Sequence, residues 1–101
     1  MDALSELQEW YVSHCNGDWE HHYGVSIDTL DNPGWQVSID LTGTGLEGKS
    51  FQDIVDLESE SEWIHCKLEE KKFQAYCSPR KLEEVIQVFL RWAKSEKAVE
   101  E

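Results

Sequence analysis

The chain has 101 residues, of which 40% are hydrophobic and five are tryptophans, and this composition excludes a disordered protein and fits one folded domain. Its net charge of −12 disfavours partners such as nucleic acid and anionic lipid. The sequence has no apolar run of about 18 residues that could span a membrane, and its acidic start is unlike a signal peptide. We therefore expect a single cytoplasmic domain over residues 1–101, with its three cysteines as free thiols.

The first predicted element is a helix over residues 3–15. Apolar side chains recur there at helical spacing, at Leu4, Leu7, Tyr11 and Cys15. Asp2 is expected to cap the start of this helix, and Gly17 to end it, because glycine tolerates the left-handed backbone of a helix end. Residues 18–22 are then predicted to form a loop.

The middle of the chain predicts five strands, at residues 23–28, 35–41, 51–57, 63–69 and 73–77. The second strand has the clearest pattern, because Trp35, Val37, Ile39 and Leu41 alternate with polar residues. Residues 31–34, Asp-Asn-Pro-Gly, predict a tight turn that joins the first two strands into an antiparallel hairpin. The same alternation directs several side chains of the last two strands toward the core: Ile64, Cys66, Leu68, Phe73, Ala75 and Cys77.

The last predicted element is a helix with Ser78 as its cap and Pro79 in its first position. One face of this helix is apolar and consists of Leu82, Val85, Ile86, Phe89, Trp92 and Ala93. Residues 95–101 are polar and are expected to fray.

This order of elements predicts an α+β fold. We expect an antiparallel sheet of about five strands in meander order, with the N- and C-terminal helices packed on one face. The opposite face would be open or partly covered, and it would carry Ser26, Asp28, Gln36, Ser38, Asp40, Trp63, His65 and Tyr76. Exposed tryptophan and tyrosine side chains are typical of interface anchors, although Trp63 could instead pack under a loop or chain end.

Ligand-type side chains are crowded into residues 14–24, which read HCNGDWEHHYG. The spacing lacks the CxxC and HxxxH patterns of common zinc sites, and we predict neither metal nor cofactor. Cys77 lies near a predicted helix start, where a thiol can become nucleophilic, but no glycine-rich loop surrounds it. The alternative function that stays open is a small enzyme or metal-binding domain that uses Cys15, His21 and His22, or Cys77.

Acidic side chains are concentrated in the first two thirds of the sequence. Residues 1–66 contain fourteen acidic residues and one lysine, a net charge of −13, whereas residues 67–101 contain seven acidic and eight basic residues, a net charge of +1. Such a field attracts a basic partner, and a surface of carboxylates can imitate a phosphate backbone in the basic cleft of a nuclease. Solubility alone is the competing explanation for the acidity.

Three motifs resemble the immunity protein 53 family of bacterial polymorphic toxin systems: NGDWEH at residues 16–21, LDNPGW at 30–35 and LTGT at 41–44. The resemblance extends from about Leu7 to Ala93. The chain departs from the family at residues 75–78, where Ala-Tyr-Cys-Ser replaces a glycine-rich segment. The resemblance implies a small cytosolic protein that neutralises a toxin, which in such systems is often a nuclease, and it defines no catalytic residue.

Together, charge and resemblance predict a toxin domain, most simply a basic protein, as the partner. We expect neither nucleic acid nor membrane as a partner, and the sequence does not predict the oligomeric state. Trp19 is expected to anchor residues 14–24 on the core, while neighbouring polar groups stay available. The residues predicted to bind the partner are Asp18, Glu20, His21, Asp28, Asp40, Trp63, His65 and Tyr76.

Overall fold

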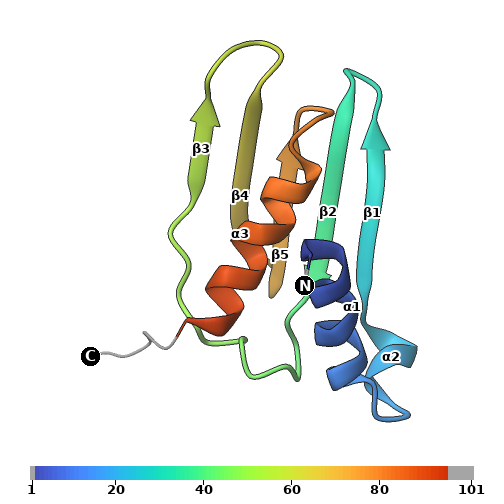
Figure 1. Ribbon diagram of the computed structural model, residues 1–101. Coiled ribbons are helices and arrows are strands. Elements are labelled where there is room, and N and C mark those ends of the chain that lie inside the picture. Colours follow the sequence, from blue (N-terminus) through green and yellow to red (C-terminus); the bar gives the residue numbers. More distant parts are fainter. Residues whose placement is uncertain (1, 96–101) are drawn as a thin grey trace.

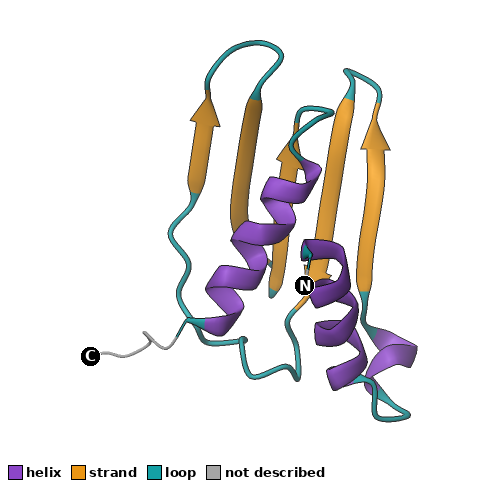
Figure 2. Ribbon diagram, viewed as in Figure 1, coloured by secondary structure: helices purple, strands orange, loops and turns teal. Residues whose placement is uncertain are grey.

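The computed structural model describes residues 2–95, which form one five-stranded antiparallel sheet and two long helices (Figure 1). In chain order the elements are α1 (Ala3–His14), α2 (Trp19–His22), β1 (Val25–Leu30), β2 (Gly34–Asp40), β3 (Ile54–Leu57), β4 (Trp63–Glu69), β5 (Lys72–Cys77) and α3 (Leu82–Lys94). Figure 2 shows α1 and α3 on the same face of the sheet, which confirms the predicted α+β fold. None of the helices in this part of the chain is long and apolar enough to cross a membrane.

The strand order, β1-β2-β5-β4-β3, differs from the simple meander that the sequence suggested. Strands β3, β4 and β5 do follow one another as a meander, but β5 then pairs with β2 and separates it from β4. Residues 41–53 carry the chain from β2 to the far edge of the sheet, which gives a Greek-key connection (Figure 1). A connection this long frees β3 from pairing with β2, so the local pattern could not predict the order.

The core lies between the sheet and the two long helices, and the predicted inward faces of the strands and of α3 are confirmed. Its buried strand residues include Val37, Ile39, Ile64, Cys66, Phe73, Ala75 and Cys77. Helix α3 adds Val85, Ile86, Val88, Phe89 and Leu90. The Phe89 ring packs edge-to-face on the Trp10 ring at 5.0 Å between centroids, and so joins α3 to α1.

Helix α1 begins as the sequence predicted. The Asp2 carboxylate accepts a hydrogen bond of 2.8 Å from the backbone N–H of Ser5, and this bond caps the helix. The helix ends at His14, and Gly17 follows with a φ of +91°, a conformation that side chains disfavour.

The predicted loop at residues 18–22 is instead the short helix α2. The Asn16 side-chain oxygen accepts hydrogen bonds of 2.9 Å from the backbone N–H groups of Asp18 and Trp19. These bonds form a turn at Asn16 that leads into α2, whose N-cap position is Asp18. The prediction of a loop was wrong because it overlooked this turn.

The start of α3 also differs from the prediction, because Ser78 does not cap it. Ser78 is fully buried, and its hydroxyl accepts a hydrogen bond of 3.1 Å from the Trp63 N–H. The Ser78 N–H in turn donates to the Trp63 carbonyl oxygen at 3.0 Å, so Ser78 continues the pairing of β4 with β5. The helix then begins at Leu82, after a turn through Pro79. The segment expected to fray, 95–101, lies outside the described residues except for Ser95, which ends α3.

Candidate functional site: the open face of the sheet

The side of the sheet that faces away from α1 and α3 (Figure 2) is here called the open face, and strand register places side chains of all five strands on it. Strand register aligns Asp28, Gln36, Tyr76, His65 and Val55 in one row across the sheet. Paired residues on neighbouring strands point to the same face and lie within contact distance of each other. The open face therefore unites predicted site residues that are distant in the sequence.

One end of this row is aromatic and apolar. The His65 and Tyr76 rings lie 6.3 Å apart between centroids, and both side chains are partly exposed. Val55 pairs with His65, and Leu57 pairs with Trp63. We call Val55, Leu57, Trp63 and His65 the edge patch, because they lie on β3 and β4 at one edge of the sheet.

Val55 and Leu57 were not predicted as site residues. Their side chains are 59% and 68% exposed, although both are large and apolar. The sequence assigned residues 51–57 to a strand with a weak pattern, and only residues 54–57 are a strand. Side chains alternate along a strand, and Ile54 pairs with the buried Cys66. A strand limited to Ile54–Leu57 would therefore have placed Val55 and Leu57 on the opposite face.

The two predicted aspartates of the open face have different surroundings. Asp28 is exposed, and no hydrogen bond or ion pair joins its carboxylate to another group within residues 2–95. Asp40 accepts a hydrogen bond of 2.9 Å from the Gly24 N–H, and its other oxygen lies 3.9 Å from the Lys72 amine. Asp40 therefore ties β2 to the residue before β1, whereas Asp28 is free to meet a partner.

The densest group of acidic side chains lies along β3, the residue before it and the loop after it: Asp53, Asp56, Glu58, Glu60 and Glu62. The only cation in ion-pair contact with this group, within the described residues, is Lys81, which lies 3.9 Å from Glu58 and 3.6 Å from Glu62. The open face itself carries both signs of charge, because Lys67 forms an ion pair of 3.2 Å with Glu69 there. The acidic group thus borders the edge patch rather than covering the open face.

Three predicted site residues, Asp18, Glu20 and His21, lie in or directly before α2 and are apart from the edge patch. Figure 1 places α2 beside the start of β1, at the opposite end and edge of the sheet from the end of β3. Of the three, Asp18 and His21 are exposed. The Glu20 carboxylate accepts hydrogen bonds of 2.9 Å from the Asn16 N–H and 2.8 Å from the Gly17 N–H. Backbone N–H groups of Glu20 itself, Asn16 and Gly17 lower the pKa of this carboxyl, so Glu20 fastens the loop before α2.

The family comparison agrees with the resemblance noted in the sequence. A family described as immunity protein 53 matches residues 4–94. The chain belongs to the immunity protein 53 family. Members of an immunity family act against toxins, so this chain is an immunity protein against a toxin. Neither the curated proteins nor the solved structures contain a significant match.

In this immunity protein the two core thiols, Cys66 and Cys77, are poorly suited to nucleophilic chemistry. Cys66 and Cys77 are buried in the core, and burial raises the pKa of Cys66 to about 12 and that of Cys77 to about 11. A reactive cysteine needs a lowered pKa and access to substrate. Cys77 is also the last residue of β5 and does not begin a helix.

The ligand-type residues of the alternative function are not gathered into a metal site either. Among residues 2–95, no group of three or more histidine, cysteine, aspartate or glutamate side chains is placed to hold a metal ion. His21 and His22 are exposed on α2. The Cys15 thiol lies 3.3 Å from the Tyr11 carbonyl oxygen within the same turn of chain. Residues 14–24 thus form the connector between α1 and β1.

Proposed function

We propose that this protein neutralises a cognate toxin in the cytoplasm by binding it through the open face, as a single domain with no catalysis of its own. The observation that carries the proposal is a sheet face that no described helix covers, with exposed apolar and partly exposed aromatic side chains in line with the exposed carboxylate of Asp28. Large side chains such as Trp63 and Tyr76 supply most of the binding energy when a partner buries them. The immunity family supplies the class of partner.

The proposed toxin has a basic surface, and a nuclease meets this requirement because its substrate is a polyanion. The net charge of −12 attracts such a protein over a distance comparable to the Debye length of about 8–10 Å at moderate salt. Attraction of this kind mainly raises the association rate, whereas buried anchors mainly lower the dissociation rate. The two groups of residues therefore have separable roles.

The test uses the toxin domain encoded next to this gene, with growth protection and binding kinetics as readouts. Asp28→Asn removes one charge from the open face, and Glu9→Gln is its matched control, because Glu9 is exposed on α1 on the other side of the molecule. Asp28→Asn should slow association at low salt more than Glu9→Gln does. Equal effects, or an association rate that salt does not change, would reject electrostatic capture by the open face.

Trp63→Ala tests the apolar part of the same face. If Trp63 is an anchor, its loss should raise Kd about tenfold or more, chiefly through faster dissociation. A thermal melt of the variant shows whether the fold is intact. An unchanged Kd in a folded variant would place the contact surface elsewhere, with the loops around Trp19 and Thr44 next to be tested. Failure of the wild-type protein to bind or inhibit this toxin would contradict the function itself.

A further inference from the structure

Strand β3 is one of the two outer strands of the sheet, and only one of its sides is paired. Its neighbour is β4, and no described strand or helix flanks its other side (Figure 1). An outer strand of this kind presents unpaired backbone N–H and C=O groups that another strand can meet. Addition of a partner strand to a free edge is a general mode of protein recognition.

The two edges of this sheet differ in the side chains that accompany the free backbone. On the open face, β1 presents Ser26 and Asp28, which are exposed and polar, and Leu30, which is only partly exposed. In the same direction β3 presents Val55 and Leu57, which are 59% and 68% exposed. Polar and charged side chains protect an edge from unwanted pairing, whereas exposed apolar ones favour a partner that buries them. Strand β3 therefore has the features of a binding edge, and β1 those of a protected edge.

Charge decides which kind of strand fits this edge. Five acidic residues lie within residues 53–62, and Lys81 is their one cationic contact among the described residues. A second copy of the chain would bring two such acidic segments together, and their repulsion opposes a dimer through β3. Lysine and arginine side chains would instead be attracted to the same segment.

We propose that β3 accepts an extended, basic segment of the toxin as a sixth strand of the sheet. This inference rests on the proposed function and specifies the partner's chemistry. Because side chains alternate along a strand, the added strand would place apolar residues against Val55 and Leu57. Its lysine or arginine residues would point to the other face, where Asp56 is exposed.

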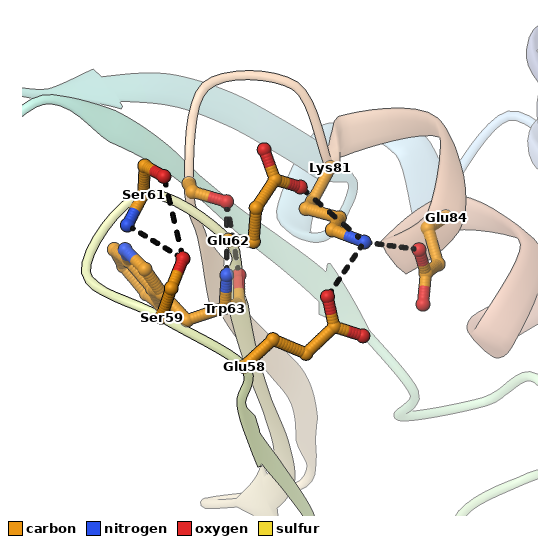
Figure 3. A network of polar contacts seen from close by, with 8 residues as sticks. Glu58, Ser59, Ser61, Glu62, Trp63, Lys81 and Glu84 are labelled. Carbon is orange, nitrogen blue, oxygen red and sulfur yellow. Dashed lines mark hydrogen bonds and ion pairs between the residues drawn. The ribbon is translucent and has the colours of Figure 1, made fainter.

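The loop after β3 is already held in place before any partner binds. Figure 3 shows the Lys81 amine between Glu84, at 3.2 Å, and the loop carboxylates of Glu58 and Glu62. Within the loop, the Ser59 N–H donates to the Glu62 carbonyl oxygen at 3.1 Å. These contacts fasten the end of β3 to the start of α3. A preformed edge loses little conformational entropy when a strand is added, which favours binding.

The experiment compares two double variants in binding to the toxin domain. Val55→Ser with Leu57→Ser removes the apolar side chains of β3. Leu4→Ser with Val12→Ser is the matched control, because these α1 side chains are 58% and 60% exposed. Both variants should melt within a few degrees of the wild-type protein, since surface changes alter stability little. The β3 variant should bind about tenfold more weakly, and the α1 variant should bind as the wild-type protein does.

Hydrogen exchange of the backbone amides supplies a readout that side-chain contact alone would not change. Binding should slow exchange in residues 54–57 and leave residues 25–30, in the other edge strand, unchanged. Tight binding without slower amide exchange in residues 54–57 would overturn strand addition and leave the proposed function intact. An equal loss of binding affinity in the β3 and α1 variants would have the same consequence. If the free protein forms a dimer in which amide exchange of residues 54–57 is slowed, a second copy of the chain rather than a basic toxin segment occupies this edge. Absence of any binding to the toxin would overturn the proposed function and this inference together.

Discussion

The indole nitrogen of Trp19 donates a hydrogen bond of 2.7 Å to the carbonyl oxygen of Thr42. This bond joins the short helix α2 to the loop that follows β2. The Trp19 side chain is buried, and its ring centroid lies 6.1 Å from that of Trp10 on α1. Trp19 therefore holds together α1, α2 and the loop after β2. This agrees with the prediction from the sequence that Trp19 anchors its loop on the core.

Removal of the Trp19 hydrogen bond should destabilise the fold measurably. Trp19→Phe keeps an aromatic ring but leaves the Thr42 carbonyl oxygen without its donor, at a cost of about 1–3 kcal/mol in the free energy of unfolding. Trp19→Ala also leaves a cavity, and should cost about 3–5 kcal/mol. Denaturant unfolding measures both values. A loss below about 0.5 kcal/mol in Trp19→Ala would show that α2 is not anchored in this way.

Gly34 should tolerate no side chain, because β5 runs too close to it. A Cβ atom at this position would lie 2.3 Å from the Cys77 carbonyl oxygen, which is a backbone atom and cannot rotate away. Gly34→Ala should therefore cost about 1–3 kcal/mol or more, in the range of overpacked sites. Gly24→Ala is the control, since its Cβ would have no neighbour within 4 Å. Equal melting temperatures for the two variants would contradict the close pairing of β2 and β5.

The two core thiols should be unreactive in the folded protein. At pH 8 an alkylating reagent should modify Cys66 and Cys77 only after denaturant unfolds the chain, because burial blocks access and disfavours the thiolate. Mass spectrometry of the peptides identifies the modified sites, and Cys15→Ser removes the third thiol. Rapid modification of Cys77 in the native state would revive the alternative enzyme function.

Because of the same thiols, the free energy of unfolding should change with pH in the alkaline range. Burial holds the pKa of Cys66 at about 12, above the ordinary value of 9.0 that it regains on unfolding. A raised pKa in the folded state gives a contribution that is complete below pH 9.0 and is lost as pH rises toward about 12. The free energy of unfolding should therefore fall above pH 9, and it should fall less steeply in Cys66→Val. Parallel curves for the two proteins would contradict the assigned burial.

Alternation predicted the strands well because their two faces meet different surroundings. Residues 63–69 were assigned correctly, since Ile64 and Cys66 face the core while Trp63 and His65 face away. The strand order was not predictable in the same way, because the long connection at 41–53 leaves the pairing of β2 to tertiary packing. The predicted cap at Ser78 was reasonable by residue type, but pairing with Trp63 takes up its hydroxyl group.

The candidate site was predictable only in part, for a physical reason. The alternation of side chains along the strands places Asp28 and Asp40 on the same face, yet it cannot show that the Asp40 carboxylate accepts a hydrogen bond from the Gly24 N–H. Glu20 likewise looks available in the sequence, whereas backbone N–H groups occupy its carboxylate. Leu57 is exposed because β3 is an outer strand of the sheet formed by residues 2–95, and local spacing contains no information on sheet edges.

The central place of β5 also sets the order in which this protein can mature during its synthesis. Strand β5 leaves the ribosome after the other four strands, although both β2 and β4 need it as their neighbour. At about 5–20 residues per second, the interval between completion of β2 and completion of β5 lasts roughly 2–7 seconds. During that interval the β1–β2 hairpin cannot join β3 and β4 in one sheet. A nascent chain thus has no assembled sheet, and the open face is complete only after β5 has emerged.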